Sequence, residues 1–75
     1  MITVKVCYES TGKPAPNKKV SLGIDELFRS GVTSSEWTDS NGEAHFDVES
    51  GEGRVFVDGS TKHKGYLKGR IVVYV

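Results

Sequence analysis

The fold is decided by the stretch WTDSNGEAHF, residues 37–46. Its centre, Asp39-Ser40-Asn41-Gly42, has the composition of a tight turn, because Asn and Gly tolerate the positive φ angles that a chain reversal requires. After the turn, polar and apolar residues alternate, as they do in a strand with one buried face: Glu43, Ala44, His45, Phe46, Asp47 and Val48. Before the turn, Trp37 is the one large apolar side chain of a polar segment. The stretch therefore predicts a hairpin whose first strand is anchored by Trp37.

The same alternation recurs on both sides of this stretch. Further short strands are expected at residues 2–8, 20–24, 54–58, 61–67 and 70–75, separated by residues that favour turns. Residues 25–30 fit either a short helical turn or a loop that places Leu27 and Phe28 over one end of the fold. About seven short strands with a turn every 8–12 residues or so are typical of an Ig-like sandwich. The sequence predicts an all-β fold, a small seven-stranded antiparallel sandwich formed by residues 1–75 as a single domain.

Two segments carry a resemblance to a known family. The first, TGKPAPNKKVSL at residues 11–22, is similar to the G-x-P-x-x-x-A-x-V-x-L opening of carboxypeptidase-regulatory-like domains, although a lysine replaces the usual small residue. The second joins the 37–46 stretch to GRVFV at residues 53–57 and resembles the T-D-x-x-G centre of the same family. These domains belong to the transthyretin-like (prealbumin-like) group. The resemblance implies a prealbumin-like sandwich that serves as a non-catalytic accessory module, aiding stability, packing or carbohydrate contact.

Charge and composition exclude several classes of function. Ten basic and ten acidic side chains cancel, so the chain has no global basic field of the kind that nucleic-acid binders use. Residues 61–70 combine bases with a single aromatic ring, which favours an edge strand protected by lysines over a nucleic-acid groove. Acids gather in residues 25–52 and bases in residues 62–70. This distribution fits either two solvated faces or complementarity between copies or with a charged partner.

Targeting and redox signals are few. The N-terminus enters an alternating strand at once, so we expect no signal peptide in this chain, and the compartment stays open. No apolar stretch approaches the length of about 18 residues that a membrane span needs. Cys7 is the only cysteine, so no internal disulfide is expected.

We expect no catalytic, metal or cofactor site. His45 shares a strand face with Glu43 and Asp47, and imidazole with carboxylates suits zinc. Residues two apart on a strand lie about 6.5–7 Å apart, however, and a metal needs ligands from a second element, so a solvated face is the favoured interpretation. The Asp39–Glu43 segment superficially resembles a calcium loop, but the strand restarts too early to supply further oxygen ligands.

Exposed apolar side chains offer the remaining functional candidates. Phe56, Val72 and Tyr74 are expected to face outward, and they would form an interface patch if their strands are neighbours. The alternative is that the twisted sheet or the Leu27–Phe28 loop covers them. We therefore predict a non-catalytic structural or interaction module that docks to a neighbouring domain or another copy through a sheet face. A carbohydrate-binding module that stacks sugars on Trp37, Tyr66 and Tyr74 is the alternative.

Overall fold

The computed structural model describes residues 1–24 and 33–75, and within these ranges the chain forms seven strands and no helix. The strands are β1 (Ile2–Cys7), β2 (Lys19–Ile24), β3 (Glu36–Trp37), β4 (Glu43–Phe46), β5 (Gly51–Val57), β6 (Ser60–Leu67) and β7 (Arg70–Tyr74). The expected positions of Leu27 and Phe28 lie outside the described residues. The prediction of a small all-β sandwich is confirmed.

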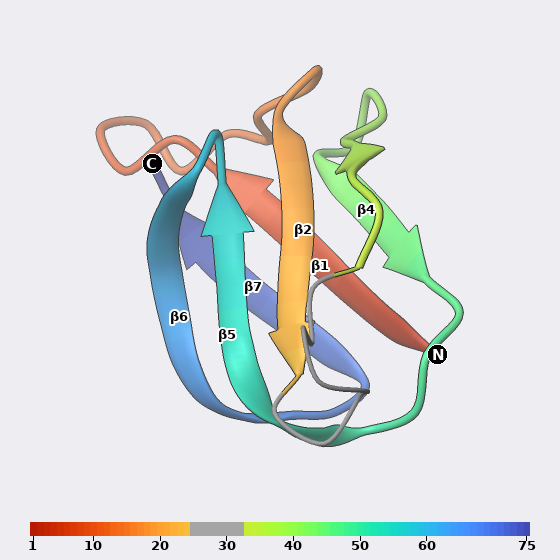
Figure 1. The fold of residues 1–75 in the computed structure, drawn as a ribbon. Coiled ribbons are helices and arrows are strands. Elements are labelled where there is room, and N and C mark those ends of the chain that lie inside the picture. The colour runs from red at the N-terminus through yellow and green to blue at the C-terminus, as the bar shows by residue number, and fades with distance from the viewer. Residues whose placement is uncertain (25–32) are drawn as a thin grey trace.

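The strands form two layers (Figure 1). One sheet has the order β4-β1-β7 and the other the order β3-β2-β5-β6. All pairings are antiparallel except β1–β7, which is parallel, so the prediction of a wholly antiparallel sandwich is wrong at this one pair. The reason lies in the connection after β6. Lys68 and Gly69 carry the chain from the four-stranded sheet into the three-stranded sheet, where β7 lines up beside β1 in the same direction.

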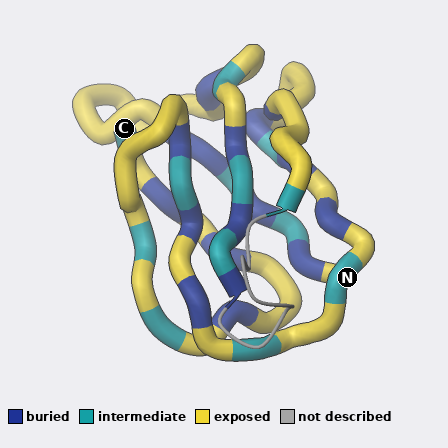
Figure 2. The backbone as a smooth tube through the Cα atoms, in the orientation of Figure 1, coloured by how far each residue is buried: buried dark blue, intermediate teal, exposed yellow. Residues whose placement is uncertain are grey.

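The core lies between the two sheets, and its buried residues alternate with more exposed ones along β2, β4, β5, β7 and most of β1 (Figure 2). Its members are mostly aliphatic: Ile2, Val4, Val6, Ala15, Val20, Leu22, Ile24, Ala44, Phe46, Val55, Val57, Leu67, Ile71 and Val73. Because alternate residues point inward, the residues between them form two outer faces, one on each sheet. These faces hold the candidate functional residues.

The stretch that predicts the fold is a corner between the sheets. β3 belongs to the four-stranded sheet and β4 to the three-stranded sheet, so the expected hairpin within one sheet is wrong. The predicted turn itself is present, since the Gly42 N–H donates to the Asp39 carbonyl at 2.9 Å. Gly42 has φ 76°, and a Cβ there would lie 2.5 Å from the Val6 carbonyl oxygen. Only glycine therefore fits the corner.

The anchor of this corner is Thr38, not Trp37. Trp37 is 62% exposed, whereas Thr38 is 3% exposed, so the prediction that Trp37 anchors the strand is wrong. The Thr38 hydroxyl donates to the Ala15 carbonyl at 2.6 Å and accepts the Lys18 N–H at 2.8 Å. These two bonds tie the corner to the segment before β2, and they set the alternation so that Trp37 points outward.

Candidate functional site

Three aromatic side chains share the outer face of the four-stranded sheet. Phe56 lies between the buried residues Val55 and Val57 and therefore points outward. Trp37 pairs with Lys19 of β2, and Tyr66 pairs with Glu52 of β5. Lys19 and Glu52 each precede a buried residue on their own strand, so both point outward. Cross-strand partners project from the same side of a sheet. Trp37, Phe56 and Tyr66 are therefore called the aromatic face.

The aromatic face combines small residues with charged ones. Ser21 lies beside Phe56 on β2, and the next outward residue on that strand is Gly23. Charged side chains of both signs complete the face: Lys19, Glu52, Arg54 and Lys64. Trp37 is 62% and Tyr66 57% exposed, while Phe56 is half-buried. The three rings and Arg54 belong to the residue types that are enriched at protein interfaces, whereas the lysines and Glu52 are typical of ordinary exposed surface.

The predicted patch of Phe56, Val72 and Tyr74 does not form. Val72 and Tyr74 alternate with the buried residues of β7, Ile71 and Val73, so they point away from the core on the three-stranded sheet. Phe56 points away from the core on the four-stranded sheet. The two groups therefore lie on opposite sides of the sandwich. Alternation in a strand predicts which residues point outward, but not which sheet the strand joins.

The prediction for the basic stretch is partly confirmed. β6, which carries Lys62 and Lys64, is the edge strand of the four-stranded sheet. A register shift between Val55 and Phe56 of β5 leaves Lys62 without a cross-strand partner, whereas Lys64 pairs with Arg54. Lysines and irregular pairing both discourage a further strand from adding to an edge.

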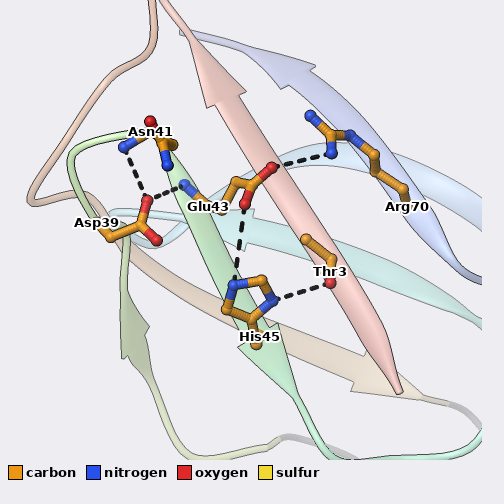
Figure 3. Close-up of polar contacts among 6 residues, drawn as sticks. All are labelled: Thr3, Asp39, Asn41, Glu43, His45 and Arg70. Carbon is orange, nitrogen blue, oxygen red and sulfur yellow. Dashed lines mark hydrogen bonds and ion pairs between the residues drawn. The ribbon is translucent and has the colours of Figure 1, made fainter.

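A polar cluster lies on the other side of the molecule, around His45 (Figure 3). His45 and Glu43 are successive outward residues of β4, and Asp39 lies in the turn before them. One donor atom from each of these three residues lies within 4.8 Å of the other two. We call Asp39, Glu43 and His45 the His45 cluster. Asp47, which the sequence suggested as the third member, is not part of this group.

Each residue of the His45 cluster is held by a further contact. His45 Nδ1 lies 2.9 Å from the Thr3 hydroxyl on β1, and Arg70 of β7 forms an ion pair with Glu43 Oε2 at 3.0 Å. Asp39 Oδ1 accepts the backbone N–H groups of Asn41 and Glu43 at 2.9 and 3.0 Å. The bond from the Glu43 N–H is the largest influence lowering the pKa of Asp39, with Asn41 and His45 acting in the same direction.

The geometry does not form a nucleophilic triad. His45 Nε2 lies 3.9 Å from Glu43 Oε1, which is beyond hydrogen-bond distance. Thr3, His45 and Glu43 therefore lack the continuous hydrogen-bonded line that activates a hydroxyl nucleophile. Cys7 is 6% exposed, so its thiol is not accessible at the surface as a nucleophile.

Comparison with known proteins does not indicate what these surfaces bind. Comparisons with protein-family models, curated proteins and solved structures found no match. Within residues 1–24 and 33–75, no helix has the length and apolar character needed to cross a membrane.

Proposed function

We propose that this chain is a non-catalytic interaction module that docks to another protein surface through the aromatic face. The observation that carries the proposal is that Trp37, Phe56 and Tyr66 all project from one outer sheet face, spread over three different strands from one edge of the sheet to the other. Trp, Tyr and Arg are the residue types that most often dominate binding energy at interfaces. Arg54, beside these rings, adds to that composition.

A second copy of the chain is the first partner to test. The net charge is zero at pH 7, so copies do not repel one another over long distances. The aromatic face also carries both signs of charge, with Lys19, Arg54 and Lys64 beside Glu52. A two-fold dimer brings the same patch of both copies together, and Glu52 of each copy can then pair with one of the three cations of the other. The resemblance of the sequence motifs to carboxypeptidase-regulatory-like accessory domains supports the same role.

Carbohydrate binding is the second candidate function. It is favoured by the exposure of Trp37 and Tyr66, since exposed rings on a sheet can stack against the apolar face of a sugar. Tyr74, the third ring that the sequence suggested, lies on the opposite sheet. A glycan array probed with the wild type and with Trp37→Ser tests this alternative, and an array without binding would exclude it for the sugars present.

Sedimentation velocity over a range of protein concentrations tests the proposed function. We expect the wild type to associate as its concentration rises, and Trp37→Ser and Phe56→Ser to weaken that association. Tyr74→Ser is the matched control, because Tyr74 is similarly exposed, at 54%, but lies on the other outer face. A wild type that stays monomeric throughout, or a Tyr74→Ser variant that alone loses association, would overturn self-docking through the aromatic face.

A further inference from the structure

We propose that Asp39, Glu43 and His45 bind a divalent transition-metal ion, with zinc as the best fit. The three residues offer two carboxylate oxygens and one imidazole nitrogen, and the donor atoms converge within 4.8 Å of one another (Figure 3). The cluster lies on the outer face of the three-stranded sheet, away from the aromatic face. The proposal is therefore independent of the proposed docking function.

The distances are close to those of a tetrahedral site. Zinc–ligand bonds of about 2.0–2.1 Å at tetrahedral angles place neighbouring ligand atoms about 3.3 Å apart. His45 Nε2 and Glu43 Oε1 are already 3.9 Å apart. The three donors thus need shifts below about 1 Å each to reach zinc-like geometry. His45 and Asp39 are exposed, so their side chains can make these shifts without moving the core.

The other polar atom of each residue is occupied, which decides the atom that faces the metal. His45 Nδ1 is engaged by Thr3, which leaves Nε2 for coordination. Arg70 contacts Glu43 Oε2, and Oε1 faces His45. Asp39 Oδ1 accepts two backbone N–H groups, which leaves Oδ2. Such outer contacts orient metal ligands in known sites, and their loss commonly weakens metal binding by about 10–100-fold.

The donor set selects the class of metal. Calcium requires about six to eight oxygen ligands and magnesium a near-octahedral oxygen shell, neither of which this cluster supplies. One imidazole with two carboxylates suits zinc, and copper or nickel by the general affinity order. Two cations share this sheet face, Arg70 on Glu43 and Lys5 as the cross-strand partner of Glu43. They offset part of the negative charge of the carboxylates and so weaken the attraction for every cation, which leaves the imidazole nitrogen as the donor that favours zinc over calcium or magnesium.

Calorimetric titration of the full chain, freed of metal by a chelator, tests the proposal with zinc chloride and with calcium chloride. We expect one zinc ion per chain and no heat from calcium. His45→Ala is expected to weaken zinc binding at least tenfold, and Thr3→Val by a smaller factor, since Thr3 only orients the ring. His63→Ala and Asp47→Asn are the matched controls, because they remove the other histidine and the carboxylate two residues after His45 on the chain.

Two further readouts separate the proposed site from general surface binding. The melting temperature of the wild type should rise with zinc concentration, and that rise should be absent in His45→Ala. Without metal, the wild type and His45→Ala should melt at the same temperature. In NMR spectra, the ring signals of His45 should shift before those of His63. Equal weakening by His63→Ala and His45→Ala, or a zinc stoichiometry unaffected by His45→Ala, would overturn the assignment.

Discussion

Replacing Thr38 with valine tests the structure at its most consequential buried polar group. Valine has nearly the same shape but no hydroxyl, so the change removes the bond to the Ala15 carbonyl at 2.6 Å and the bond from the Lys18 N–H at 2.8 Å. Ala15 is fully buried, so its carbonyl loses its partner away from water. A buried polar group left without a partner costs about 1–3 kcal/mol. The Lys18 N–H is only part-buried and contributes less, which gives about 2–4 kcal/mol in total.

This loss is large for a chain of 75 residues. Stability of about 0.05–0.15 kcal/mol per residue gives the whole domain about 4–11 kcal/mol. One kcal/mol corresponds to about 4–8 °C for a domain of this size, so Thr38→Val should lower the melting temperature by at least about 8 °C. Urea unfolding followed by tryptophan fluorescence measures the free energy directly. Thr38→Ser is the control, because it keeps the hydroxyl and loses one methyl group, which costs about 1 kcal/mol. If valine is tolerated as well as serine, the two hydrogen bonds do not hold the corner.

Three further predictions concern the turns and the sheet contact. Gly42→Ala should destabilise the fold far more than Gly12→Ala. Both glycines have similar positive φ angles, but only a Cβ at Gly42 meets backbone, 2.5 Å from the Val6 carbonyl oxygen. Equal melting temperatures of the two variants would contradict this close approach. Gly53→Ala should be more damaging than Gly59→Ala in thermal melts, since a Cβ at Gly53 would lie 2.0 Å from the Gly23 carbonyl oxygen, whereas nothing lies within 4 Å at Gly59. Asp39 stabilises the fold while ionised, and this contribution is present above its ordinary pKa of 3.8 and is lost as the pH falls through its lowered folded-state pKa. In metal-free buffer, urea midpoints at about pH 6 and pH 3 should therefore differ less for Asp39→Asn than for the wild type, and an unchanged difference would refute the role of the two N–H bonds.

The sequence predicted the strands well, because alternation directly reports one buried face. The inward positions of β5 and β7 are an example, since Val55 and Val57, and Ile71 and Val73, are buried as expected. Alternation carries no information about pairing partners. The sheet that each strand joins depends on connections such as Lys68-Gly69, and this explains why Phe56 and Tyr74 were expected together and lie on opposite sides.

The errors at the corner and at the His45 cluster have a common cause. Hydrophobicity favours Trp37 as the buried residue of its segment, but two hydrogen bonds to Thr38 decide the orientation, and both partners are distant in sequence. Spacing along the strand likewise suggested Asp47 beside His45. The turn instead brings Asp39 to the cluster, because its carboxylate caps the backbone N–H groups that lead into β4. A possible signal was Asp at the first position of the turn, where its side chain bonds to backbone groups shortly after it.

The pairing of β1 sets an order for folding. β1 is the middle strand of its sheet, and its partners are β4 at Glu43–Phe46 and β7 at Arg70–Tyr74. Neither partner is its neighbour along the chain, and the local pairing of β1 is short, an isolated bridge between Cys7 and Pro14 with the backbone bonds beside it. By contrast, β5 and β6 are joined by a short turn and can pair early. Sheets that depend on distant pairings fold slowly, in about milliseconds to seconds for small β proteins. During synthesis, β1 therefore leaves the ribosome before either of its sheet partners, and it gains both only after β7 has been made.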